Sequence, residues 1–215
     1  MLRVEFHCHT IFSRDSLCTP EKLVTACQRK NIDRVVVTDH NTIQGALYAQ
    51  QIDPQRVIIG EEIMTLEGEL LAAYVTEEIP RGLPAEEAIT RLRKQSAFIS
   101  VSHPFDEDRN GHWKLANLER ILPLVDAIET FNSRCLQKSF NTKAQLFARE
   151  HNLPGTVGSD AHAAFELGRA TLLLTDFNDA ESLRTVLPEG QASTKLSSPW
   201  VHFASVYAKW KKGLL

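Results

Sequence analysis

Histidines and carboxylates of this 215-residue chain fall in short clusters, each directly after an apolar, β-branched run. Five of its eight histidines belong to them. The clusters are His7-Cys8-His9, Asp39-His40, Gly60-Glu61-Glu62, Ser102-His103-Pro104 and Gly158-Ser159-Asp160-Ala161-His162, and Asp15 lies just beyond the first. Imidazole nitrogens and carboxylate oxygens suit divalent zinc, manganese or iron. The pattern predicts a multinuclear metal enzyme whose ligands converge from several strand ends.

Two of the clusters contain pairs that can chelate one ion. His7 and His9 are two residues apart, so on a strand both imidazoles point to the same face. Asp160 and His162 repeat this spacing, and the short residues around them let the backbone approach a cluster of ions closely. Taken alone, the histidine pair can equally be a chance surface pair.

His40 and His103 are candidate single ligands. Asp39 either orients a neighbouring ligand as a hydrogen-bond acceptor or caps a helix over residues 43–51. Pro104 ends a strand and restricts His103 to an extended backbone, which would hold the imidazole at the strand tip. A structural histidine is the alternative at that position.

Glu61 and Glu62 are candidates for a bridging ligand, because a carboxylate can bind two cations at once. Strand alternation sends one side chain into the barrel and the other away. The residues by themselves do not say which one points inward, and a solvated acidic turn is the competing interpretation.

Eight apolar runs are expected to form the strands that position these clusters. They are residues 4–6, 34–38, 57–60, 70–75, 98–102, 127–131, 156–158 and 170–174. Stretches with helical periodicity lie between most of them. This alternation predicts an α/β fold with a mainly parallel sheet, closed as a compact or distorted barrel. Catalytic groups collect at the carboxyl ends of the strands in such folds.

A single domain is expected, with the barrel in residues 1–190 and a C-terminal loop and helix in residues 191–215. Residues 193–199 are polar and typical of a loop. Aromatic residues then recur at near-helical spacing, at Trp200, Phe203, Tyr207 and Trp210. The favoured interpretation is a helix that packs its aromatic face on the barrel, and a partner-binding helix is the alternative.

The composition excludes several other classes of protein. A net charge of −3 gives no general attraction to nucleic acid or to an anionic membrane. No apolar stretch is long enough for a membrane span, and the N-terminus has no signal-peptide core. The four cysteines show neither CxxC spacing nor a disulfide framework. A cytoplasmic protein without membrane partners is expected.

In this order, the clusters resemble the motifs of the PHP (polymerase and histidinol phosphatase) family of metal enzymes. The matching motifs are His7-Cys8-His9-Thr10, Thr38-Asp39-His40-Asn41, Gly60-Glu61-Glu62, Ser102-His103-Pro104, Glu129-Thr130-Phe131-Asn132 and Gly158-Ser159-Asp160-Ala161-His162. The resemblance implies a distorted (β/α)7 barrel, similar to a TIM barrel, with two to three manganese, zinc or iron ions at the strand ends.

The resemblance also implies which residues hold each ion. The implied sets are His7, His9 and Asp160 for the first ion, Glu62 as a bridge to a second ion held by His103, and Asp15, His40 and His162 for the third. Better-studied trinuclear members carry a further histidine after the strand that contains Glu129. Residues 129–140 contain none, so water or Asn132 would complete the second site.

Within the family, the chain looks closest to short stand-alone phosphoesterases. This implies hydrolysis of a phosphomonoester or phosphodiester, such as a nucleotide or a short oligonucleotide, by a metal-bridging hydroxide. The expected catalytic residues are Glu62, Asp160 and His162. The expected substrate-binding residues are Arg134, Arg169 and Asn132, because a guanidinium fork matches phosphate oxygens, although each arginine can equally be a surface residue.

Two alternatives stay open at this point. One is a hydrolase for a non-phosphate substrate such as an amide, because metal-activated water is not specific for phosphorus. The other is a catalytically silent, metal-binding structural module. The complete series of ligands from His7 to His162 favours an enzyme.

Overall fold

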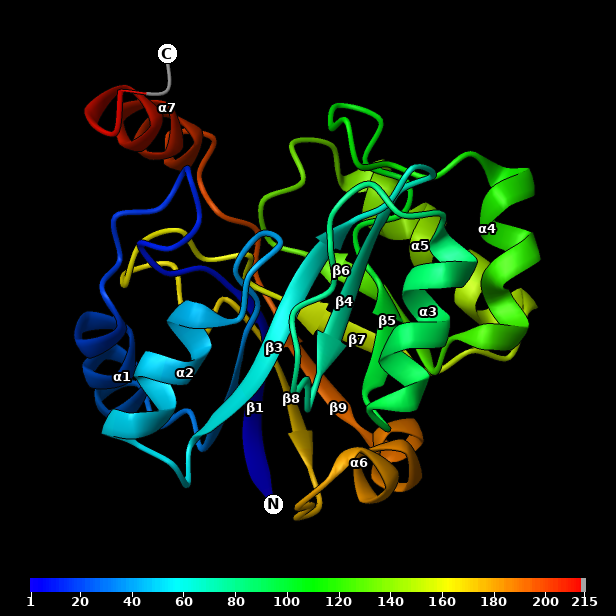
Figure 1. The fold of residues 1–215 in the computed structure, drawn as a ribbon, viewed down its shortest axis with the longest axis horizontal. Helices are drawn as coiled ribbons and strands as arrows, with labels where there is room; N and C mark the ends of the chain where they lie inside the picture. Colours follow the sequence, from blue (N-terminus) through cyan, green and yellow to red (C-terminus); the bar gives the residue numbers. More distant parts are fainter. Residues whose placement is uncertain (214–215) are drawn as a thin grey trace.

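In the computed structural model, which describes residues 1–213, nine strands form one sheet that curls into a nearly closed barrel (Figure 1). Residues 214–215, at the end of the expected C-terminal segment 191–215, lie outside the described residues. The strand order is β7-β6-β5-β4-β3-β2-β1-β8-β9. The strands are β1 (Leu2–Cys8), β2 (Arg34–Val37), β3 (Val57–Met64), β4 (Glu69–Ala73), β5 (Phe98–Val101), β6 (Ala127–Asn132), β7 (Gly155–Gly158), β8 (Ala170–Leu174) and β9 (Gln191–Thr194).

Seven α-helices in residues 1–213 surround this sheet. They are α1 (Pro20–Arg29), α2 (Gln44–Ile52), α3 (Ala85–Lys94), α4 (Leu115–Ile121), α5 (Lys138–Glu150), α6 (Ala180–Val186) and α7 (Val201–Lys211). In Figure 1, α1 and α2 lie on one side of the sheet and α3, α4 and α5 on the other. Helix α7 lies at the end of the molecule opposite the N-terminus, which is the end toward which β1 runs. The predicted α/β barrel is confirmed.

Loop contacts after β7 close the barrel against β1. His9 N donates a hydrogen bond to Ala161 O at 2.8 Å. Below it, Ser159 N donates to Glu5 Oε1, also at 2.8 Å. These bonds bring the first and last histidine clusters of the sequence side by side.

The expectation of a mainly parallel sheet is wrong. Four strand pairs are parallel (β1–β2, β2–β3, β5–β6 and β6–β7), whereas β3–β4, β4–β5, β1–β8 and β8–β9 are antiparallel. Only residues 65–68 connect β3 to β4, and a parallel crossover needs a dozen or more residues. The expectation of a loop over residues 193–199 is also wrong in part. Residues 193 and 194 belong to β9, which pairs with β8.

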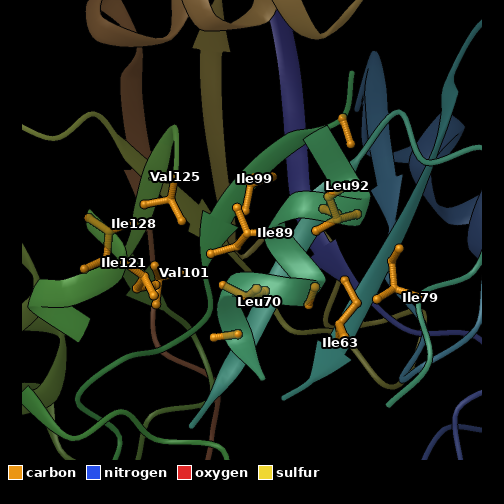
Figure 2. Packing of buried hydrophobic residues seen from close by; sticks show 14 of the residues in the cluster. Ile63, Leu70, Ile79, Ile89, Leu92, Ile99, Val101, Ile121, Val125 and Ile128 are labelled. Atoms are coloured by element: carbon orange, nitrogen blue, oxygen red, sulfur yellow. The ribbon is translucent and has the colours of Figure 1, made fainter. Parts of the chain in front are cut away.

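A large hydrophobic cluster fills the space between the sheet and helices α3 and α4. Figure 2 shows Ile63, Leu70, Ile99, Val101 and Ile128 of the strands against Ile89, Leu92 and Ile121 of the helices. Burying each such side chain contributes about 2 kcal/mol. This packing fixes the position of β3 and β5, whose carboxyl-terminal ends carry Glu62 and His103.

Asp126, directly before β6, links two helices to the sheet. Its carboxylate accepts hydrogen bonds from Arg93 Nη1 of α3 at 2.8 Å and Arg184 Nε of α6 at 3.0 Å. Ile99 N of β5 donates to it at 2.8 Å. Burial alone would raise the pKa of Asp126, but these hydrogen bonds lower it below the usual value.

The expected packing of aromatic residues on the barrel is also wrong. Helix α7 buries Val201, Ser205 and Ala208. The aromatic residues turn to solvent, with exposed fractions of 75% for Trp200, 65% for Phe203, 52% for Tyr207 and 64% for Trp210. The spacing identified a helical face correctly, but the face that packs is its small-residue side.

The cysteines and the apolar character of the helices were also expectations from the composition. The four cysteines are buried and unpaired thiols. Within residues 1–213, no helix has the length and apolar character that a membrane crossing requires.

Candidate metal centre

The polar clusters converge at the strand ends around Glu62. Its Oε2 lies 3.2 Å from His7 Nε2, 3.3 Å from His9 Nε2 and 3.1 Å from His40 Nδ1. Its Oε1 lies 3.1 Å from His103 Nε2. The structure thus places this carboxylate among four imidazoles that come from three separate segments of the chain, the ends of β1, β2 and β5.

Glu61 points away from this cluster. It is fully buried, and its Oε2 accepts a hydrogen bond from Ile79 N at 3.0 Å. Burial, together with the negative charge of nearby Glu78, raises the pKa of Glu61 to about 8. Strand alternation therefore decides the choice that the sequence left open, with Glu62 inward and Glu61 outward.

Asp160 approaches the same cluster from the loop after β7. Its Oδ1 lies 3.2 Å from His9 Nε2 and 3.6 Å from His7 Nε2. Its backbone is left-handed, with φ at 52°, a conformation that aspartate tolerates better than most residues. Gly158, two residues earlier, provides the necessary space, because a Cβ there would lie 2.3 Å from His7 Cβ.

Asp15 and His162 form the outer side of the centre. Asp15 Oδ1 lies 3.2 Å from His162 Nε2 and 3.7 Å from His40 Nε2. His9 also belongs here, because its ring centroid is 4.2 Å from that of His162. The structure therefore brings together all eight of the residues that the sequence suggested as metal ligands.

Glu69 is a further carboxylate at the centre that sequence reasoning missed. Its Oε2 lies 3.4 Å from His103 Nε2, and its Oε1 lies 3.9 Å from His40 Nδ1. Burial raises its pKa, and the negative charge of Glu62 raises it further. Glu69 is the first residue of an antiparallel strand, so it lies at the same edge as the last residues of the parallel strands. The short 65–68 connection was the signal that could have revealed it.

Three of the histidines are held from outside the cluster through their Nδ1 atoms. His7 Nδ1 donates to Glu129 Oε1 at 2.9 Å, and His162 Nδ1 lies 2.8 Å from Asp160 O. His9 Nδ1 lies 3.1 Å from Ser13 Oγ, which donates to Asp39 at 2.6 Å. In each case the Nε2 atom faces the cluster, which is the usual arrangement of metal-binding histidines. Asp39 therefore orients His9 and does not cap α2, which begins at Gln44.

The side chains fit a cluster of divalent ions. Glu62 Oε2, Asp160 Oδ1 and Asp15 Oδ1 are buried and have no hydrogen-bond partner within residues 1–213. Buried carboxylate oxygens are costly when unpaired. Three overlapping groups of side chains have ligand atoms close enough to share an ion: His7, His9 and Glu62; His40, Glu62 and Glu69; and His9, His40 and His162.

The electrostatics of the cluster agree with cation binding. Burial alone would raise the pKa of Glu62, but His7 and His40, with the hydrogen bond from His103, hold it well below its usual range. Burial, together with the neighbouring His162 and His40, lowers the pKa of His9 to about 3. His9 is thus a neutral imidazole, which is the form that binds a metal ion.

An arginine that the sequence did not suggest reaches the centre. Arg109, in the loop between β5 and α4, donates from Nη1 to Asp160 Oδ2 at 2.6 Å and from Nε to Asp106 Oδ2 at 2.8 Å. It lines a cavity of about 380 Å³ that also reaches Asp15, His40, Glu69 and His162. The guanidinium of Arg109 therefore holds the Oδ2 atom of Asp160, while the Oδ1 atom of Asp160 faces the histidines.

The three expected substrate-binding residues have different surroundings. Arg134 lines the same cavity, but Nη2 donates to Ser205 Oγ at 2.9 Å beneath α7. Asn132 is buried, and its Nδ2 donates to Glu129 Oε2 at 3.1 Å and lies 3.3 Å from Asp160 Oδ2. Arg169 lines a different surface hollow and donates to Leu196 O at 3.0 Å. The structure thus places two of the three near the centre.

Comparison with known families gives matches over most of the chain. A model described as "PHP domain" matches residues 5–125, and one described as "PHP-associated" matches residues 138–192. The uncharacterized protein MJ0417 of Methanocaldococcus jannaschii is 36% identical over 180 residues, which are 82% of this chain and 72% of that protein. The uncharacterized protein MJ1587 of the same organism is 32% identical over 61% of this chain and 82% of its own length.

Solved structures share the fold at low sequence identity. A two-domain protein from Bacteroides vulgatus, described as containing a predicted PHP-like metal-dependent phosphoesterase, has a TM-score of 0.71 and 18% identity. The match covers 90% of this chain, which spans 65% of that protein. PsfC from Pseudomonas syringae has a TM-score of 0.69 and 17% identity, with 98% of this chain and all of that chain covered. The lesion-specific endonuclease EndoQ from Pyrococcus furiosus has a TM-score of 0.58 and 17% identity over 92% of this chain and 59% of its own.

Proposed function

Because this chain belongs to the PHP domain family, we propose that it is a metal-dependent phosphoesterase that hydrolyses a phosphomonoester or phosphodiester. The observation that carries the proposal is the position of Glu62 among four imidazoles, one of which, His40, lines the adjoining cavity. The fold relative described as containing a predicted metal-dependent phosphoesterase, and the one described as a lesion-specific endonuclease, agree with it.

The side chains divide into three sets of ion ligands. His7, His9 and Asp160 would hold the first ion, and Glu62 would join it to a second ion held by His103 and Glu69. Asp15, His40 and His162 would hold the third. Manganese, zinc and iron all match these nitrogen and oxygen ligands. Glu69 takes the place for which water or Asn132 was expected.

When bound, divalent ions at such a centre supply a water nucleophile at neutral pH and neutralise charge on the phosphoryl group. The protein itself contributes position and charge. Glu129 and Ser13 fix the imidazoles of His7 and His9, and Arg109 fixes the carboxylate of Asp160. The guanidinium of Arg109 borders the cavity, where it can also face phosphate oxygens. Water would add to phosphorus and the ester P–O bond would break, which leaves an alcohol and a phosphate or phosphomonoester.

Hydrolysis of p-nitrophenyl phosphate and bis(p-nitrophenyl) phosphate by the manganese-supplemented protein tests this function. We expect Asp160→Asn to lower kcat/KM by at least about 100-fold, because the variant loses one charged ligand and the partner of Arg109. Glu61→Gln is the matched control, since Glu61 is equally buried but faces away from the centre.

Two results would overturn the proposal. A protein that binds ions but hydrolyses neither ester would be a silent metal-binding module. Turnover of amides or carboxylic esters alone would identify a hydrolase for non-phosphate substrates.

A further inference from the structure

Helix α7 forms one wall of the cavity above the metal centre. Ser205, Val206 and Lys209 line this cavity together with the candidate ligands. Lys209 Nζ lies 3.7 Å from Asp15 Oδ2. The helix follows residue 192, where the second family match ends. It therefore lies outside the residues that the two family models match.

Contacts at both ends hold α7 in this position. Near its start, Arg134 Nη2 donates to Val201 O at 3.1 Å and to Ser205 Oγ at 2.9 Å. Just after its end, Lys212 Nζ donates to Ile11 O at 2.7 Å. Ile11 belongs to the loop that carries Asp15, so the helix is tied directly to the centre. Figure 1 shows it over that loop, at the end where β1 finishes.

The outward side of α7, with the residue before it, carries an aromatic surface made of two pairs of rings. The rings of Trp200 and Phe203 are stacked with centroids 5.3 Å apart, and those of Tyr207 and Trp210 are 5.9 Å apart. All four side chains are more than half exposed. Four large exposed rings on one short helix are unusual on a protein surface and are typical of a binding site.

This aromatic surface adjoins the cavity. Val206 lines the cavity, and it is three residues after Phe203 and four residues before Trp210. Residues with these spacings are neighbours on a helix surface. A ligand in the cavity can therefore continue over Val206 onto these two rings without leaving the protein.

Charge on the same helix selects the chemistry of the ligand. Lys209, Lys211 and Lys212 lie at its C-terminal end, whereas the whole chain has a net charge of −3. A ligand of α7 must thus combine anionic groups with flat apolar ones. Unpaired nucleotides have this combination, and proteins bind them with lysines along the backbone and aromatic rings against the bases.

We propose that α7 is a base-stacking wall, and that the substrate is a short single-stranded nucleic acid. This inference rests on the proposed phosphoesterase function. The scissile phosphate lies in the cavity beside Lys209 and Arg109, and the neighbouring bases stack on Phe203 and Trp210. A duplex is a poor ligand because its bases are already stacked on each other.

The kinetic test uses a single-stranded thymidine pentanucleotide and bis(p-nitrophenyl) phosphate as paired substrates. For Phe203→Ala/Trp210→Ala, we expect the ratio of kcat/KM for the pentanucleotide to kcat/KM for the small ester to fall by about 100-fold, about tenfold for each lost stacking ring. The loss should appear in KM. Trp210→Phe keeps a ring and should retain most of the ratio. Phe165→Ala is the matched control, because Phe165 is 60% exposed but lines other hollows of the surface.

A binding test is independent of turnover. The chain has three tryptophans, and Trp113 is only 4% exposed, so fluorescence quenching by a ligand reports mainly on Trp200 and Trp210. We expect the pentanucleotide to quench this fluorescence in the presence of EDTA, and a hairpin duplex in which the same thymidines are paired with adenines to quench it much less.

The outcomes separate this inference from the proposed function. If neither the pentanucleotide nor bis(p-nitrophenyl) phosphate is hydrolysed but the pentanucleotide quenches the tryptophan fluorescence, the phosphoesterase function fails and the stacking surface stands. If the small ester is hydrolysed and the ratio is the same in all variants, the α7 inference is overturned. Equal quenching by strand and duplex would also overturn it. So would a dimer, seen by sedimentation velocity, that the double alanine variant converts into a monomer, because the surface would then be a self-association face.

Discussion

Replacement of Glu62 by glutamine tests the architecture of the metal centre most directly. Glutamine keeps the shape of the side chain but removes its charge, and its amide nitrogen does not bind a cation. The neighbouring Glu61 offers a matched control on the same strand. Since burial raises the pKa of Glu61 to about 8, this side chain is mainly neutral at pH 7, and glutamine is a close mimic of it.

The size of the effect follows from the geometry. Glu62 belongs to two of the three groups of side chains that can share an ion, and the third consists of His9, His40 and His162. Glu62→Gln should therefore weaken two ions and largely spare one. Loss of a residue that only orients a ligand costs 10- to 100-fold in metal affinity. For a direct ligand we expect at least 100-fold per ion, or about 3 kcal/mol.

Elemental analysis after equilibration with limiting manganese and a competing chelator measures this effect. We expect the wild-type protein and Glu61→Gln to retain the same number of ions, and Glu62→Gln to retain up to two fewer. Circular dichroism verifies that both variants are folded. Equal metal content in the two variants would refute the placement of Glu62 as the bridge, and so would an equal loss from both.

Three further predictions follow from the same geometry. Arg109→Lys cannot hold Asp160 with a planar fork, so kcat/KM for bis(p-nitrophenyl) phosphate should fall by about 10- to 100-fold while the metal content stays the same; a parallel loss of metal would instead make Arg109 part of ion binding. Gly158→Ala places a methyl group 2.3 Å from His7 Cβ, and urea unfolding should show a loss of about 1–3 kcal/mol, whereas an unchanged midpoint and metal content would contradict the close packing. Asp126→Asn removes a carboxylate that accepts from the arginines of α3 and α6, at a cost of about 2–3 kcal/mol at pH 7. Because the folded pKa of Asp126 is lowered, the wild-type advantage should be complete above the unfolded pKa of about 3.9 and shrink as the pH falls below it; an equal difference at pH 7 and pH 3 would exclude this origin.

Local sequence predicted much of the fold because strand and ligand signals are local. Each of the eight apolar runs coincides with one of the strands β1 to β8, since β-branched residues favour a pleated, half-buried surface. Each polar cluster directly follows such a run, and spacing by two places the imidazoles of His7 and His9 together. Asp160 and His162 instead lie in the loop after β7, where the left-handed backbone of Asp160 replaces the alternation of a strand. Convergence of these clusters also followed from the alternation of strands and helices.

Other features depend on strand direction. The 65–68 connection reverses the chain, and this reversal brings the first residue of β4 to the edge where the parallel strands end. Apart from that short connection, no ligand pattern around Glu69 indicated its position, because its partners, His40 and His103, are about 30 residues away in both directions. Arg109 is similar, since only the folded loop directs it to Asp160, 51 residues later.

The sequence by itself determined the chemistry of the centre, because the ligand types and their period-two spacing are properties of short segments. Tertiary structure decided which glutamate faces the ions, which arginine reaches the cavity and which side of α7 is buried. Each of these choices is made by packing between distant segments. On α7, Val201, Ser205 and Ala208 allow close approach to the barrel, which bulky rings would prevent. The aromatic side of the helix, which the spacing alone suggested would be buried, thus remains open beside the cavity.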